Sequence, residues 1–294
     1  MKSVRCSSWL VLILLGVLGA GCAGELPPPP PRPAVTVGQP DRDALHLGGT
    51  GAMTPLVTLL GEEWTRRGGI PRILVEESIG SGGGIRATYD GAIDLGMVSR
   101  PLSTDEVSLG LVSIPVGRDV VAIVAHPGLY ADGFLAAELP ALYRGEQKRF
   151  ADGSVAVPLL RDRSESANSA LDRVVAGLAE AREQAYKQRR LRVLYNDRAM
   201  AEALAGTPGS FGVFSLSWLL AYRLPLKVLS IDGVHPSPQA VADRHYHGSR
   251  ELYFVARPER LARARAFLDF IRSPEAKTLV RSYGYLPAEA AGVP

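Results

Sequence analysis

A glycine-rich segment near the start of the chain contains residue types suited to holding an anion. Four of the residues 80–84 are glycines and the remaining one is Ser81, so successive backbone N–H groups can turn toward one point without steric cost. Residues 85–89 favour a helix, whose first N–H groups lack partners and carry part of a positive charge. Ser99 and Arg100 follow a short apolar stretch and add two side-chain donors. The pattern predicts a site for an oxyanion.

The elements that must position these donors follow the order of a parallel α/β sheet. We predict strands at 45–49, 72–76 and 93–98, with one helix that has Thr54 as its N-cap and a second helix over 82–89. Because the carboxyl ends of parallel strands share one edge of a sheet, the segments 49–54 and 80–84 are expected to meet Ser99 in one crevice.

The rest of the chain repeats the alternation of strands and helices. Apolar runs predict strands at 119–126, 157–160, 212–215, 226–231 and 252–256. Helical periodicity predicts a helix over 135–143, one long helix after Asn168 that includes Leu178, and two final helices over 261–271 and 276–283.

Residues 1–21 have the pattern of a bacterial export signal. Lys2 and Arg5 precede an apolar run at 9–18, which is too short to span a bilayer as a mature helix. Small residues then lead into Cys22 and resemble a lipobox, so we predict that Cys22 is lipidated after cleavage. An ordinary cleaved signal peptide is the alternative.

Residues 22–43 are rich in proline and predict a stiff tether between the lipid and the folded part. The two cysteines are Cys6 and Cys22, so lipidation of Cys22 would leave no thiol for a disulfide in the mature chain. The hydrophobic residues, 46% of the total, suffice for a large core. No later apolar stretch approaches a membrane span.

Composition and motifs argue against several other function classes. A net charge of +3 is too small to indicate a polyanionic partner, and the basic residues of 182–192 are interleaved with only one aromatic residue, Tyr186, so we predict no nucleic-acid binding. His245 and His247 lack the Cys or carboxylate neighbours of a metal site, and we predict neither a metal nor a cofactor. No Gly-x-Ser-x-Gly elbow or partnered nucleophile is visible, so we predict that the chain is not an enzyme.

Six motifs occur in the order typical of the phosphate-binding proteins of bacterial ABC importers, which this chain therefore resembles. They are the segments 49–53, 80–84, 94–103, 138–146, 209–213 and 284–287. The resemblance implies an α/β, two-lobed type II periplasmic binding-protein fold, with a ligand cleft between lobes joined by two crossing strands. It places the first lobe at 44–118 with a return at 249–294, and the second lobe at 119–248.

The resemblance also implies which residues bind the anion. The expected set draws on both lobes and comprises Thr50, Ala52, Met53, Thr54, Ser81, Gly82, Gly83, Ser99, Arg100, Arg161, Ser164, Ser166 and Asn168. Within the first loop, either Thr50 or Thr54 is to supply the hydroxyl that many relatives carry at the position of Met53.

Two positions depart from the family pattern. Ser99 stands where well-studied phosphate binders have an aspartate, which would accept the proton of hydrogen phosphate, so the preferred oxyanion stays open. Glu165 brings a carboxylate close to the expected anion. It either pairs with Arg163 or indicates a ligand other than phosphate.

The resemblance implies a lipid-anchored extracytoplasmic solute-binding protein that captures phosphate or a similar oxyanion for an ABC importer. Its expected partners are that anion, an ABC permease and, through the lipid on Cys22, the periplasmic side of the inner or outer membrane. We expect a monomer. The alternative function is an oxyanion-sensing or scaffolding lipoprotein that is not coupled to transport, and an exported hydrolase is less favoured.

Overall fold

The computed structural model describes residues 43–288. The predicted signal segment, the lipidation at Cys22 and the tether up to residue 42 lie outside the described residues. None of the helices within 43–288 has the length and apolar character needed to cross a membrane.

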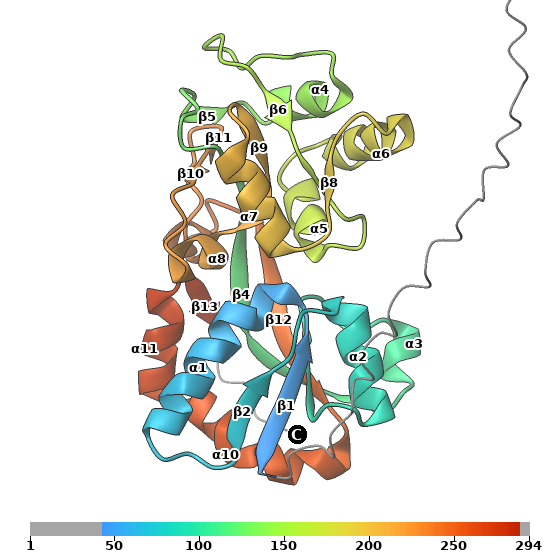
Figure 1. Cartoon of the computed structure of the whole chain (residues 1–294), viewed down its shortest axis with the longest axis vertical. Coiled ribbons are helices and arrows are strands. Elements are labelled where there is room, and N and C mark those ends of the chain that lie inside the picture. The colour runs from blue at the N-terminus through green and yellow to red at the C-terminus, as the bar shows by residue number, and fades with distance from the viewer. Residues whose placement is uncertain (1–42, 289–294) are drawn as a thin grey trace, which may run out of the picture. The chain divides into compact units, whose positions relative to one another are not determined.

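The first part of the chain forms the predicted parallel α/β arrangement. Strand β1 (Ala44–Gly49) pairs in parallel with β2 (Arg72–Val75) on one side and with β3 (Leu95–Val98) on the other. Helices α1 (Thr54–Arg66) and α2 (Gly80–Asp90) connect these strands in turn (Figure 1). The predicted order of strands and helices is confirmed here.

The glycine-rich segment lies in the first turn of α2 and not in a loop ahead of that helix. The reason is close packing of α2 on the sheet: a Cβ on Gly84 would lie 2.8 Å from the Cα of Gly49 and 3.1 Å from the carbonyl oxygen of Met97. Only the first residue of the segment, Gly80, has a positive φ, at 74°. The glycines therefore serve the approach of α2 to the strands as well as the turn.

The predicted helix cap at Thr54 is also displaced. A short 3-10 turn, η1 (Gly51–Met53), precedes α1, and its cap is Thr50, whose Oγ1 accepts a hydrogen bond from the N–H of Ala52 at 3.4 Å. Thr54 is the first residue of α1, and its side chain caps neither turn.

Two long strands join the first part of the chain to the second. Strand β12 (Ser249–Ala256) lies antiparallel between β3 and β4 (Val112–Ala125), and β4 continues to pair with β9 (Ser210–Ser215). Strand β4 begins seven residues before the predicted strand at 119–126, so a single element reaches both parts (Figure 1). Its alternating apolar residues contribute to both main hydrophobic cores.

The second part contains shorter strands packed among helices. Strand β6 (Val157–Pro158) pairs in parallel with β9, and β7 (Leu160–Arg161) pairs in parallel with β8 (Val193–Leu194). The other elements of this part are β5 (Gly133–Phe134), α4 (Glu138–Arg144), α7 (Asp197–Gly206), α8 (Leu216–Ala221), β10 (Lys227–Val228), β11 (Ser230–Ile231) and α9 (Pro238–Ala242).

The single long helix predicted after Asn168 is wrong. The segment forms two helices, α5 (Ser166–Asp172) and α6 (Leu178–Gln188). Gly177 separates them with a left-handed backbone, φ 76°, which glycine adopts readily and which no helix interior contains. The break lets α5 present its first residues to the crossing strands while α6 packs against α4.

The chain then returns to the first core. Helix α10 (Leu261–Ile271) has the predicted bounds, and α11 (Pro274–Ser282) begins at the proline because Ser273 caps it by accepting from the N–H of Ala276 at 3.1 Å. Strand β13 (Tyr285–Pro287) then pairs with β4. The remaining elements are α3 (Thr104–Val107) and the 3-10 turn η2 (Pro258–Arg260).

We expect Gly84→Ala to destabilise the fold by about 1–3 kcal/mol, because the new methyl group meets the backbone of β1. The matched control is Gly82→Ala, whose Cβ would have no neighbour within 4 Å and which should be neutral or stabilising by up to about 1 kcal/mol. Urea unfolding of both variants measures the difference. Equal shifts in the two midpoints would contradict the close approach.

Candidate functional site

Three hydroxyl groups from separate segments meet around the side chain of Ser99. Its Oγ lies 3.0 Å from Oγ1 of Thr50, 3.2 Å from Oγ of Ser81 and 2.7 Å from Oγ of Ser166. A serine hydroxyl donates one hydrogen bond and accepts two, so these three neighbours satisfy Ser99 completely. We call Thr50, Ser81, Ser99 and Ser166 the hydroxyl cluster.

The parallel sheet positions three members of this cluster. Residues Thr50 and Ser99 follow the carboxyl ends of β1 and β3, and the N–H of Thr50 donates to the carbonyl of Met97 at 2.9 Å. Ser81, in the first turn of α2, accepts from the N–H of Ser99 at 3.1 Å. Both Thr50 and Ser99 are buried. The fourth member, Ser166, comes from the first residue of α5 in the second part of the chain.

Two buried arginines stand behind the hydroxyl cluster. Arg250 on β12 donates to Oγ of Ser166 at 3.0 Å and to Oε1 of Glu165 at 2.5 Å. Arg161, the last residue of β7, donates to Oε2 of the same glutamate at 3.0 Å. The side chains of the two arginines are 3% and 2% exposed respectively, so both charges depend on protein partners.

Two further carboxylates complete the pairing of these arginines. Asp119 on β4 lies directly opposite Arg250 in the strand register, and its Oδ2 is 3.0 Å from both Nε and one terminal nitrogen of that guanidinium. Asp119 also accepts hydrogen bonds from Ser215 and Ser217 at 2.7–2.9 Å. Asp197, at the start of α7, lies 3.1 Å from Arg161.

Burial and nearby charges shift the pKa values of two carboxyl groups of the site in opposite directions. Burial alone would raise the pKa of Glu165, but the charges of Arg250 and Arg161 outweigh it and lower that pKa to about 2. At Asp197 burial has the larger effect and raises the pKa of the carboxyl group. The positive charge of Arg161 opposes this rise most, but Arg161 also pairs with Glu165. Glu165 is therefore ionised in the folded protein across the neutral range.

The structure does not bring several predicted residues to the hydroxyl cluster. Arg100 binds both carboxylate oxygens of Glu106 at 2.7 Å and makes no hydrogen bond to the hydroxyl cluster. Ser164 is exposed and donates to Asp162 at 2.5 Å, and Asn168 donates to the carbonyl of that aspartate at 2.8 Å. These two side chains stabilise the turn that precedes α5.

The backbone donors predicted around η1 have partners within the turn. The N–H of Met53 donates to the carbonyl of Thr50 at 3.2 Å, and the Met53 side chain is fully buried in the first core. The N–H of Thr54 donates to Gly51. The hydroxyl of Thr50 joins the cluster, whereas that of Thr54 is buried without a hydrogen-bond partner among residues 43–288. Ala52 bonds to Thr50 as described above.

The first turn of α2 contributes a side chain to the site rather than its glycines. Ser81 reaches Ser99, whereas Gly82 is exposed and Gly83 packs beside Ile79. Of the two alternatives for Glu165, the pairing with Arg163 is wrong, because Glu165 binds Arg161 and Arg250. Arg163 instead binds Glu183 at 3.1 Å and stacks over Tyr186.

Sequence reasoning missed Arg250, Asp119 and Asp197. A signal existed for the first two, since each is a charged residue within a mostly apolar strand, and such a residue is buried only with a partner. Which residue pairs with which depends on the register of β4 against β12, and this register has a shift between Leu252 and Tyr253. The residue pattern within each strand does not reveal this register.

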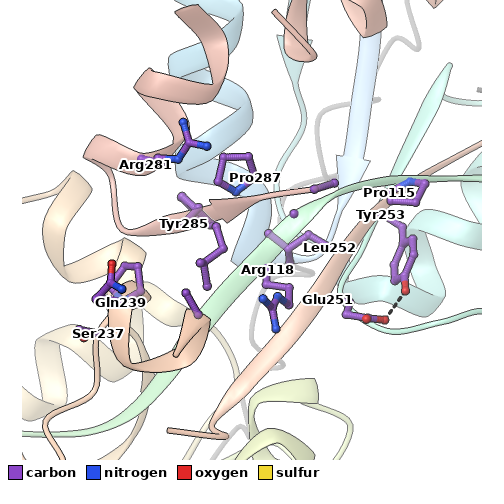
Figure 2. A pocket seen from close by; sticks show the side chains of 15 residues that line it. Pro115, Arg118, Ser237, Gln239, Glu251, Leu252, Tyr253, Arg281, Tyr285 and Pro287 are labelled. Atoms are coloured by element: carbon purple, nitrogen blue, oxygen red, sulfur yellow. Dashed lines mark hydrogen bonds between the residues drawn. The ribbon is translucent and has the colours of Figure 1, made fainter. Parts of the chain in front are cut away.

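A hollow of about 980 Å³ lies elsewhere, along the opposite face of the same two strands. Arg118 and Glu251 line it, and they neighbour Asp119 and Arg250 in the chain, so strand alternation places them on the other face. Figure 2 shows these side chains together with Tyr253, which donates to Glu251. None of the predicted site residues lines this hollow.

A family model described as the PBP superfamily domain matches residues 34–275. The chain belongs to the PBP superfamily. Membership in the PBP superfamily agrees with the parallel α/β part, the crossing strands β4 and β12, and the second α/β part described above.

Individual relatives agree with this assignment. The chain is 25% identical over 251 residues to the phosphate-binding protein PstS of Bacillus subtilis (strain 168), an alignment covering 83% of this chain and 80% of that protein.

Solved structures of the same fold include two from other bacteria. A candidate phosphate ABC transporter substrate-binding protein of Clostridium perfringens, with bound phosphate, matches with a TM-score of 0.71 at 20% identity and covers 84% of this chain and 100% of its own. An ABC-type phosphate transport receptor of Vibrio cholerae matches with a TM-score of 0.60 at 18% identity, covering 83% and 100%.

We expect Asp119→Asn to destabilise the protein by about 3–5 kcal/mol, because it leaves the buried guanidinium of Arg250 short of a charge. The control Glu106→Gln removes an ion pair whose arginine is 40% exposed and should cost about 1 kcal/mol or less. Thermal or urea unfolding measures both. Similar losses in the two variants would argue against a special role for the buried pair.

The pKa of Glu165 predicts how acid affects stability. Its value of about 2 in the folded protein lies below the ordinary 4.5, so the unfolded state binds the proton first and the contribution of Glu165 is lost as pH falls from about 5 toward 2. Glu165→Gln should therefore show a shallower loss of unfolding free energy over this window than the parent. Glu183→Gln, which removes an exposed carboxylate, is the control and should keep the parental slope.

Proposed function

We propose that this chain captures phosphate or a similar tetrahedral oxyanion at the hydroxyl cluster and delivers it to an ABC importer. The observation that carries the proposal is the convergence of Thr50, Ser81 and Ser99 from one part of the chain with Ser166 from the other, around a single atom. Hydroxyl donors on several sides suit the oxygens of a tetrahedral anion, and the buried arginines supply the opposite charge.

The proposed route of binding separates the two parts of the site. The contact between Ser99 and Ser166 is the one direct hydroxyl contact of the cluster that bridges β3 and α5. An anion entering there would exchange this hydrogen bond for bonds from both serines to its oxygens. Strands β4 and β12 are the natural hinge for such an opening, since both continue from the first core into the second part.

The relatives support the choice of ligand. Their names include phosphate-binding protein PstS, and the Clostridium perfringens structure contains bound phosphate. We therefore assign phosphate as the first ligand to test. Because Ser99 stands where well-studied phosphate binders have an aspartate, experiment must decide among phosphate, sulfate, arsenate and molybdate.

The remaining parts of the proposal concern the setting of the protein. We infer lobes at 44–118 with 249–294 and at 119–248, because the two main cores follow this division closely. We further infer an extracytoplasmic monomer without enzymatic activity, tethered through a lipid on Cys22. The family membership supports a binding role, and the sequence pattern before Cys22 supports the anchor.

Titration calorimetry of the purified protein with phosphate, sulfate, molybdate and arsenate tests the proposal. We expect heat and a thermal shift with phosphate between about pH 6 and 8, where its mono- and dianions dominate. The absence of both signals with all the anions would refute it.

Two substitutions test the location of the site. Ser81→Ala removes one hydroxyl donor and should weaken phosphate binding by about 2- to 10-fold. Arg161→Ala removes a buried charge and should weaken it by about tenfold or more. Arg163→Ala is the control, because this exposed arginine binds Glu183 and should leave affinity unchanged. Circular dichroism checks that each variant is folded, and unchanged affinity in both site variants would place the cleft elsewhere.

A further inference from the structure

We propose that Glu165 is an internal competitor for the captured anion: its carboxylate occupies the place between the guanidiniums of Arg161 and Arg250 that an incoming oxyanion needs. The inference rests on the proposed function and names what limits affinity at that same site. It makes Glu165 an affinity-determining residue, which the family pattern at this position does not suggest.

The carboxylate bridges the two arginines as a bound oxyanion would. Oε1 of Glu165 accepts from Arg250 at 2.5 Å, and Oε2 accepts from Arg161 at 3.0 Å. The same nitrogen of Arg250 also donates to Ser166 of the hydroxyl cluster at 3.0 Å. Glu165 therefore lies beside the cluster and uses the guanidinium hydrogens that point toward it.

Among the three carboxylates of the site, Glu165 is the one that an anion can displace. Asp119 is fully buried and accepts from Arg250 and two serines. The side chain of Asp197 is 8% exposed and lies beneath η1, where its Oδ2 would be 2.5 Å from a Cβ on Gly51. That of Glu165 is 19% exposed and begins just before α5, so rotation about its own side-chain bonds carries its carboxylate toward solvent.

The balance of charges in the site explains why Glu165 and an incoming anion compete for the two arginines. The two buried guanidiniums face three carboxylates, Asp119, Glu165 and Asp197, so an anion that entered with Glu165 in place would be repelled by an excess of acidic groups. Once Glu165 leaves, the anion takes its place between the same two arginines. Binding is thus an exchange of one anion for another, and its net affinity is lower than the donors alone would provide.

Calorimetry of Glu165→Gln with phosphate and with sulfate tests the proposal. We expect both anions to bind about tenfold or more tightly than to the parent protein, because the amide keeps the shape of the side chain but removes its charge. Glu183→Gln, on α6, removes a carboxylate from an exposed pair and should leave both affinities unchanged. Equal or weaker binding to Glu165→Gln would overturn the proposal.

A second variant guards against a folding defect. Glu165→Asp keeps the charge but is one methylene shorter, so it cannot reach both guanidiniums, and it should also bind phosphate more tightly than the parent. In addition, phosphate should raise the melting temperature of Glu165→Gln more than that of the parent, since the freed arginines gain a partner. A variant that stays unfolded in chloride and is not restored by phosphate counts against the proposal.

The outcomes separate this inference from the proposed function. If the parent binds phosphate and neither variant binds it more tightly, the competitor role fails and the function stands. If only the variants bind it, the competitor role is supported and the parent protein is not a phosphate carrier under these conditions. If no form binds any oxyanion, both proposals fail.

Discussion

The pairing of Asp119 with Arg250 across two crossing strands is the constraint on which the site depends. The two residues face each other in the register of β4 and β12, both are buried, and each would be costly there without the other. Since Arg250 also binds Glu165 and Ser166, this one guanidinium ties the strands that join the two parts of the chain to the segment that carries the fourth hydroxyl.

Under the proposed function, this arrangement would link binding to the hinge. An oxyanion that changed the partners of Arg250 would act directly on a side chain of a crossing strand, so capture of ligand and movement of α5 relative to β3 would share the same contacts. The hydroxyl cluster has the complementary role. Its serines and threonine exchange partners at little cost, because hydroxyl groups both donate and accept, whereas the buried ion pairs keep the framework in place.

Much of the fold was readable from pattern. The first three strands and their helices follow from apolar runs and punctuating residues, and the bounds of α10 are as predicted. The break between α5 and α6 could not be predicted from the sequence. The charged and apolar residues on either side of Gly177 keep a helical period, while the glycine itself takes a left-handed backbone. Periodicity records which face is buried and not where a backbone turns.

The sequence by itself determined that Ser81 and Ser99 would meet, since parallel strands of one sheet end at the same edge and the helix that leads from β2 to β3 starts there. Only the tertiary structure decided which residues complete the site on the side of α5. Glu165 and Arg250 are 85 residues apart, and their contact depends on strand register and on the turn before α5. It likewise turned Arg100 toward Glu106, because a nearby carboxylate offers a guanidinium two charged hydrogen bonds that need no ligand.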